Sequence, residues 1–199
     1  MRTTFYRVIP PIIAASLISA TLTGPVHANQ VTVNFSAIYA AATCTITAPA
    51  SVSFNQGTYA QGVPATAIQG EAVQQSFNLE FSDCKNTSML AVTPFINVDG
   101  TVVTLNGEKL FSNNTGESGE AVGYGVRLST AGNSYFNAAE NLALNNTLSV
   151  TQGTNIESIN NQQLSMKAVL TCGQNDCSDM TNRSGGAFTA RVIFRLNYE

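Results

Sequence analysis

The last fifteen residues of the chain, "GGAFTARVIFRLNYE", place the strongest constraint on its fold. Apolar side chains occupy every second position, at Phe188, Ala190, Val192, Phe194, Leu196 and Tyr198. A period of two is typical of a β-strand with one buried face. A long apolar strand left on a sheet edge also exposes unpaired backbone groups, which invites aggregation. We therefore expect another strand, from the same molecule or from a second one, to pair with it.

The remainder of the chain lacks helical periodicity and contains short alternating runs bounded by Gly, Asn, Ser and Asp. This pattern favours an all-β sandwich. The predicted strands are "QVTVNFSAIYAAATCTITA", "SVSF", "QQSFNLEFSDC", "LAVTPFINV", "TVVTLNG", "VGYGVRLS", "QQLSMKAVLTC" and "AFTARVIFRLNY". The Asn-rich stretches "SNNTGESGE" and "NLALNNTLSVTQGTNIESINNQQ" are predicted to be turns and surface loops.

Residues 1–28 have the order of a secretory signal peptide. Arg2 and Arg7 precede an apolar middle, and small residues end the segment at Ala28. The alternative is a membrane anchor, but Pro10-Pro11 interrupts the apolar run, and no later run approaches the length of a spanning helix. Cleavage after Ala28 would leave 171 residues, which is enough for one domain with a substantial core.

The charged residues and the histidine count exclude several functions. Without Arg2 and Arg7, seven basic side chains stand against twelve acidic ones, and no basic run occurs. A nucleic-acid or anionic membrane surface is therefore not expected. The only histidine, His27, lies within the signal segment, which excludes histidine-dependent nucleophilic catalysis and histidine metal sites from the mature protein.

Four cysteines in an exported chain indicate disulfides. In "CGQNDC", four turn-forming residues separate Cys172 from Cys177, so these two are expected to pair, which leaves Cys44 with Cys84. The competing interpretation is a zinc site, but the mature chain has no histidine and lacks two short cysteine pairs. We expect no metal and no cofactor.

The start of the mature chain is a second strand-like segment, residues 29–43. Its alternation places five residues on one face: Val31, Val33, Phe35, Ala37 and Tyr39. The segment precedes the first cysteine, so it is able to leave its own domain and add to the sheet of another molecule.

These features together resemble the pilin subunits of chaperone–usher fimbriae, the type 1 and P pilus family. The resemblance covers the whole mature chain. It rests on the arm before Cys44, the dipeptide Asp83-Cys84 after an alternating strand, the penultimate Tyr198, and Gly186 as the fourteenth residue from the end. Alternating apolar residues lie between Gly186 and Tyr198.

The resemblance implies an incomplete immunoglobulin-like sandwich over residues 44–199 that lacks its last strand and is completed by donor-strand complementation. The acceptor groove would follow Gly186, Phe188, Ala190, Val192, Phe194, Leu196 and Tyr198. A periplasmic chaperone would fill the groove first, and the arm of the next subunit would replace it at the outer-membrane usher. The chain would then be exported through the periplasm into a fimbrium on the bacterial surface, where it supports adhesion.

Two departures from the family pattern stand out. Donor arms usually carry glycine where this chain has Ala37, so partner choice is expected to differ. The "CGQNDC" pair is not expected in a major pilin. It suggests either a specialised minor or adaptor subunit or a stapled loop.

Other functions remain as alternatives. A single-domain adhesin would bind a host glycan or protein receptor through residues 141–163, although a solvated insertion is the simpler interpretation of that stretch. Two-domain tip adhesins lack a free arm. The acidic residues are dispersed, and "GTVVTLNGEKL" contains no phosphate loop. We therefore expect no enzymatic activity.

Overall fold

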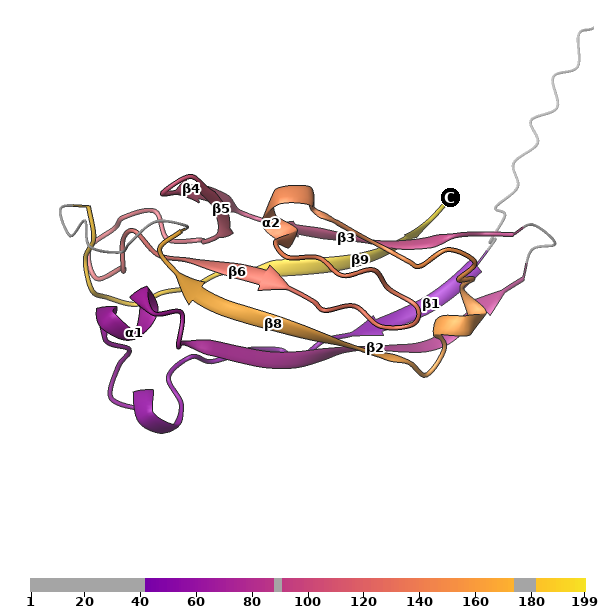
Figure 1. Ribbon diagram of the computed structural model, residues 1–199, viewed down its shortest axis with the longest axis horizontal. Coiled ribbons are helices and arrows are strands. Elements are labelled where there is room, and N and C mark those ends of the chain that lie inside the picture. Colours follow the sequence, from indigo (N-terminus) through magenta and orange to yellow (C-terminus); the bar gives the residue numbers. More distant parts are fainter. Residues whose placement is uncertain (1–41, 88–90, 174–181) are drawn as a thin grey trace, which may run out of the picture. The chain divides into compact units, whose positions relative to one another are not determined.

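Two antiparallel β-sheets form the computed structural model, as Figure 1 shows. The structure describes residues 42–87, 91–173 and 182–199, all of which belong to one unit of the chain, Ile38–Glu199. The larger sheet has the strand order β1-β2-β8-β6-β5-β4, and the smaller one has the order β7-β3-β9. The all-β fold expected from the alternating pattern is confirmed.

The strand bounds are as follows: β1 (Ala42–Thr47), β2 (Gln74–Asn86), β3 (Pro94–Gly100), β4 (Val102–Leu105), β5 (Glu108–Phe111), β6 (Gly125–Ser129), β7 (Thr147–Ser149), β8 (Gln163–Thr171) and β9 (Val192–Tyr198). Four short helical segments occur within the described residues: η1 (Gly57–Tyr59), α1 (Ala65–Gln69), α2 (Leu142–Asn145) and η2 (Glu157–Ile159).

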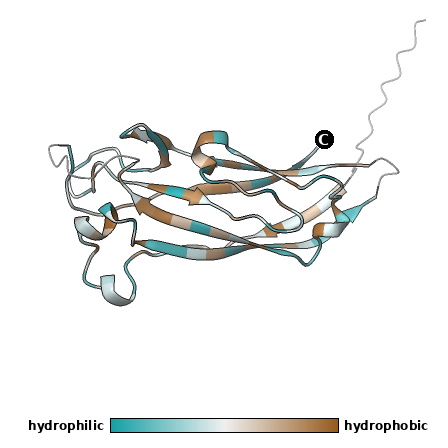
Figure 2. Ribbon diagram, viewed as in Figure 1, coloured by the Kyte–Doolittle hydropathy of each residue, from teal (hydrophilic) through white to brown (hydrophobic). Residues whose placement is uncertain are grey.

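The core lies between the two sheets because each strand buries one of its faces. Figure 2 shows hydrophobic and hydrophilic residues alternating along the strands. On β2, Leu79 and Phe81 are almost fully buried, and Ile96 on β3 is completely buried. The ring of Phe81 stacks on that of Phe136, with the centroids 4.9 Å apart. Burial of this kind is the main stabilising term of the fold.

The chain crosses from the smaller sheet to the larger one at Gly100. β3 ends there, and β4 begins two residues later in the other sheet. A Cβ atom on Gly100 would lie 2.7 Å from the carbonyl oxygen of Arg191 and 2.8 Å from the ring of Phe111. Only glycine fits such a close approach. The crossover therefore ends the partnership of β3 with the C-terminal strand at this point.

Several predicted elements differ from the structure. The segment "SVSF", residues 51–54, is not a strand, and β9 begins at Val192 rather than at Ala187. Strands β5 and β7 were not expected. Residues 30–41 of the first predicted strand lie outside the described residues.

The prediction of a surface loop for residues 141–163 is wrong. This stretch contains α2, β7 and η2, and it contributes six buried apolar side chains to the core: Leu142, Ala143, Leu148, Val150, Ile156 and Ile159. Its asparagines form turns and caps rather than a solvated insertion. The side chain of Asn141 accepts a hydrogen bond from the N–H of Ala143 at 3.0 Å, and Asn146 ends α2 in the left-handed conformation.

Candidate strand-docking surface

The outer edge of β9 is the main feature of the candidate site. β9 pairs with β3 on one side, and within the described part of the chain no strand pairs with its other side. In this ladder Thr93 and Glu199 exchange both backbone hydrogen bonds, at 2.9 and 3.1 Å. Hydrogen-bonded pairs recur every second residue in an antiparallel ladder, so the odd-numbered residues of β9 face β3.

The even-numbered residues of β9 therefore direct their N–H and C=O groups toward the outer edge. They are Val192, Phe194, Leu196 and Tyr198, the same residues whose side chains pack against the core. Each of these side chains is half-buried. The outer edge thus combines unpaired backbone groups with an apolar wall, which is the combination that β-strand addition requires.

Phe194 occupies the centre of this wall. Its ring lies 6.4 Å from that of Phe77 on β2, centroid to centroid, with a tilt of 59°. The pair therefore joins the C-terminal strand to the larger sheet across the core. The neighbouring Ile193 points the other way and is 37% exposed. At the end of the strand, burial raises the pKa of the Tyr198 hydroxyl above its ordinary value of 10.0.

A cavity of about 380 Å³ lies beside β9. Phe194 and Val192 line one side of it, and residues 48–52 line another. Its apolar floor comes from the larger sheet, through Phe77, Val126, Leu128 and Ala168. A second cavity of about 500 Å³ shares Val52, Phe54 and Phe188 with the first, and it extends to Gly186. The apolar surface therefore continues beyond the start of β9 along residues 186–191.

Strand β1 is the edge strand of the larger sheet, and it also contacts β9. Its inward residues Ala42, Cys44 and Ile46 are half-buried and pack against the core, whereas the intervening threonines are exposed. The two sheets thus end on edge strands at the same side of the sandwich. β1 and β9 are the two strands that an added strand would have to contact.

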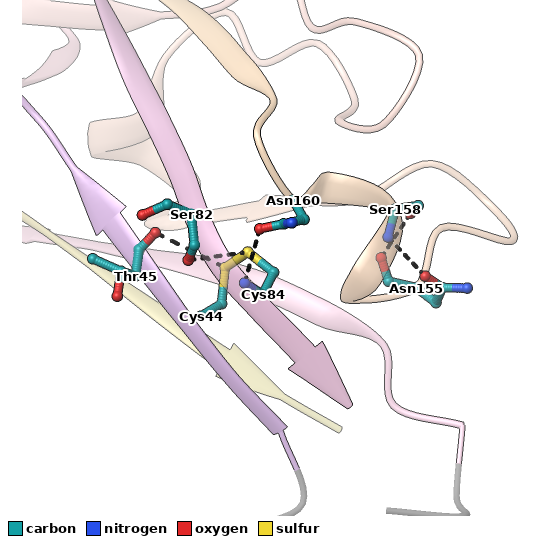
Figure 3. The surroundings of a disulfide bond; sticks show 7 residues. All are labelled: Cys44, Thr45, Ser82, Cys84, Asn155, Ser158 and Asn160. Atoms are coloured by element: carbon teal, nitrogen blue, oxygen red, sulfur yellow. Dashed lines mark hydrogen bonds between the residues drawn. A yellow bond between two sulfur atoms is a disulfide. The ribbon is translucent and has the colours of Figure 1, made fainter. Parts of the chain in front are cut away.

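A disulfide holds β1 in place. Cys44 bonds to Cys84 on β2, forty residues along the chain, as the sequence predicts (Figure 3). The register of the two strands shifts at this point, because Asp83 adopts a positive φ of 53° and forms a bulge. The N–H of Cys84 donates to the side chain of Asn160 at 3.0 Å, which fixes the bulged backbone. The disulfide and this hydrogen bond anchor the edge strand to the core.

Gly186, which the sequence marks as one end of the groove, is required there by a close backbone approach. A Cβ atom at this position would lie 2.5 Å from the carbonyl oxygen of Gly119 and 2.5 Å from the carbonyl carbon of Glu120. Of the predicted groove residues, Gly186 and Phe188 line the second cavity, and Phe188, Ala190, Val192 and Phe194 line the first, whereas Leu196 and Tyr198 line neither. Val52 and Phe54 line both cavities but were not among the predicted groove residues, because their alternation in "SVSF" was interpreted as a strand.

Two sets of predicted residues fall outside the described part of the chain. The arm residues Val31, Val33, Phe35, Ala37 and Tyr39 are one set, and Cys177 is the other. Cys172 is disulfide-bonded and almost completely buried.

A polar cavity of about 1170 Å³ lies elsewhere on the larger sheet. Within it, Nε of Arg127 lies 2.7 Å from Oε1 of the buried Glu108, and Asn141 donates to the same oxygen at 3.1 Å. Arg127 also pairs with Glu71. No group of three or more potential metal-ligating side chains occurs within residues 42–87, 91–173 and 182–199. None of the helices in those ranges has the length and hydrophobicity needed to cross a membrane.

Of the comparisons with known proteins, only the one with solved structures gave matches. No family profile matches the sequence, and no curated protein matches it. Among solved structures, the chain is similar to the P pilus rod subunit PapA, at 16% identity and a TM-score of 0.41. The match covers 84% of this chain and 100% of that one.

Proposed function

We propose that this chain is a structural subunit of a chaperone–usher pilus, which assembles when the outer edge of β9 accepts a β-strand from a neighbouring molecule. The observation that carries the proposal is the coincidence of two features on the same residues. Val192, Phe194, Leu196 and Tyr198 direct backbone groups toward an edge without a described partner strand and line an apolar surface beside it. An incoming strand would satisfy both features at once.

The length of the arm agrees with the length of the acceptor surface. The surface from Phe188 to Tyr198 spans eleven residues, or about 36 Å at roughly 3.3 Å per residue. Of the predicted arm, residues 29–43, the last two belong to β1, and the thirteen residues before β1, 29–41, measure about 43 Å when fully extended. The arm of one subunit is therefore long enough to fill the whole surface of another, with two residues left over to join the two domains.

The proposal includes the partners that such an assembly needs. A periplasmic chaperone would supply the strand before assembly, because an apolar edge of this kind aggregates when left open. An outer-membrane usher would be the site of exchange, and the finished fimbrium would lie on the bacterial cell surface, where it supports adhesion. We place the chain as a minor or adaptor subunit because of the additional "CGQNDC" cysteine pair.

The test uses two adjacent residues of β9 that face opposite ways. In the full chain, Phe194→Ser removes a groove side chain, whereas Ile193→Ser changes an exposed neighbour and serves as the matched control. A labelled peptide of residues 29–43 is expected to bind the wild type and the Ile193→Ser variant. We expect it to bind the Phe194→Ser variant at least tenfold more weakly, since a buried aromatic side chain contributes more than 1.4 kcal/mol.

A second experiment addresses assembly. Soluble yield should depend on co-expression of a periplasmic pilus chaperone, and the dependence should increase when residues 29–43 are deleted. A chain without the arm that is soluble, stable and monomeric, with neither chaperone nor peptide, would show that the sandwich is complete and would refute the proposal.

Binding to a host surface is the second candidate function, and one observation favours it. Asn141 and Asn145 of the Asn-rich stretch line the polar cavity of about 1170 Å³. A glycan array separates the two candidates. Tight glycan binding that survives deletion of residues 29–43 would favour the adhesin.

A further inference from the structure

Residues 187–191 continue the direction of β9 toward its N-terminal side, but they have lost the strand that β9 pairs with. β3 leaves the smaller sheet at Gly100, opposite Val192. Beyond this point no strand of the described residues borders the chain on that side. Yet Phe188 and Ala190 are half-buried and line the groove, so their backbone must be held in an extended form by something else.

Two asparagine side chains occupy the position that the missing strand would have. Oδ1 of Asn114 accepts hydrogen bonds from the N–H and the hydroxyl of Thr189, at 3.0 and 3.2 Å. Nδ2 of Asn114 donates to the carbonyl oxygens of Ala187, at 2.7 Å, and Ala121, at 2.9 Å. One side-chain amide thus connects its own backbone to residues 187–189 and to Ala121.

Asn113 extends the same arrangement. Its N–H donates to the carbonyl oxygen of Thr189 at 2.9 Å, and its side-chain oxygen accepts from the N–H of Arg191. The side-chain amide also donates to the hydroxyl of Thr101, the first residue after the crossover, at 3.3 Å. The hydrogen bonds of the two asparagines therefore start at the point along the C-terminal segment where the pairing with β3 stops.

Within residues 187–191, all of these bonds go to the odd-numbered residues. These residues therefore face the same side of the chain on which β3 pairs with β9. The carbonyl oxygen and N–H of Ala187 follow the same rule, bonding to Ala121 and Gly119 at 2.8 Å each. The even-numbered Phe188 and Ala190 are left to direct their backbone groups to the groove side, in phase with Val192 and Phe194.

We infer that Asn113 and Asn114 act as a fixed substitute for a β-strand, holding residues 187–191 extended so that the docking surface continues past the end of β9 before any partner arrives. The two asparagines are positioning residues, because they contact the acceptor segment and not the added strand. The inference rests on the proposed function for the identity of the occupant, but not for the role of the asparagines in holding the segment.

The alternation of the backbone gives the test two independent readouts by amide hydrogen exchange in the full chain. The amides of Thr189 and Arg191 report the hold of the asparagines, since they face Asn113 and Asn114. The amides of Ala190 and Val192 face the groove and report occupation by a strand. The probe is the synthetic peptide of residues 29–43.

The variant Asn114→Ala is compared with Asn137→Ala. Asn137 is a matched control, because its amide donates to Ser149 and to the carbonyl oxygen of Val150, at 3.1 and 2.8 Å, away from β9. We expect Asn114→Ala to raise the exchange rate of Thr189 about tenfold and to weaken peptide binding about tenfold, since it removes more than one hydrogen bond. Asn137→Ala should leave both unchanged.

Asn114→Asp serves if the alanine variant fails to fold. It keeps an oxygen that accepts from Thr189 but sets a second carboxylate oxygen, which only accepts, against the carbonyl oxygens of Ala187 and Ala121. We therefore expect both readouts to change at least as much as in the alanine variant. Unchanged exchange of Thr189 in the Asn114 variants would overturn the inference, as would faster exchange with unchanged peptide affinity. If the peptide fails to protect Ala190 and Val192 in the wild type, the proposed function fails, whereas the exchange of Thr189 still decides what Asn114 holds.

Discussion

Gly186 offers a test of the packing at the far end of the docking surface. An alanine there would place its Cβ 2.5 Å from the carbonyl oxygen of Gly119, 2.5 Å from the carbonyl carbon of Glu120 and 2.8 Å from the nitrogen of Ala121. All three are backbone atoms, so no flexible side chain is available to move aside. Ordinary contact begins near 3.4 Å, so the two segments must separate by most of an ångström.

That separation would break the two hydrogen bonds that flank the contact, from Ala187 to Gly119 and from Ala121 to Ala187, each now 2.8 Å long. At about 1 kcal/mol for each bond, the loss is about 2 kcal/mol. For a chain of this size, this corresponds to a melting temperature lower by about 4 to 8 °C.

Gly185 provides the matched control for Gly186. A Cβ atom on Gly185 would meet no atom within 4 Å, so Gly185→Ala should unfold at the wild-type temperature or slightly above it. The assay is thermal unfolding followed by circular dichroism on the wild type and both variants. Equal melting temperatures for Gly185→Ala and Gly186→Ala would refute the close approach and, with it, the packing of the segment against residues 119–121.

Three further perturbations test other parts of the structure. Replacing Cys44 and Cys84 by serine should lower the free energy of unfolding by about 4 kcal/mol, since the bond closes a loop of forty residues. Urea unfolding of both proteins measures the loss, with the m-value fitted separately for each because removal of the crosslink expands the unfolded chain. Backbone N–H groups that donate to the Glu120 carboxylate hold its pKa below its ordinary value of 4.5. The carboxylate therefore stabilises the folded state above that pH, and this stabilisation is lost as the pH falls. Glu120→Gln should flatten the pH dependence of the melting temperature between about pH 6 and 3. Arg127→Met leaves the buried carboxylate of Glu108 without its cation and should lower the free energy of unfolding by about 3 kcal/mol. Arg195→Met breaks an exposed pair with Asp99 and should lower it by less than about 1 kcal/mol. Equal losses in urea unfolding would contradict the difference in burial.

The alternating strands were predictable from the sequence because their buried faces follow a period of two over most of their length. β2 and β8 were found in this way within two residues of their bounds, whereas the predicted start of β9 lies five residues before the observed one. β5 was missed since its sequence, "EKLF", is short and begins with a buried glutamate whose charge is balanced by Arg127. Tertiary pairing, and not local pattern, makes it a strand.

The Asn-rich stretch was misjudged for a related reason. Asparagine at a helix cap and asparagine in a solvated loop have the same appearance in a sequence, and only the surroundings distinguish them. Asn141 caps α2, and Asn160 holds the bulge beside the disulfide. The roles of Asn113 and Asn114 were equally invisible, because their partners lie about 75 residues away along the chain.

The alternation along β9 has a consequence for errors in assembly. Each residue that offers its backbone to a partner also offers its side chain, so a partner strand displaced by one residue loses both the hydrogen bonds and the apolar contacts. A displacement of two residues, about 6.7 Å, restores both. Competing registers on this surface are thus separated by steps of two residues. The nearest competing register differs only in which side chain enters which part of the groove. A partner strand with similar apolar residues at every second position would bind in several registers, two residues apart. A partner with side chains of unequal size would favour a single register.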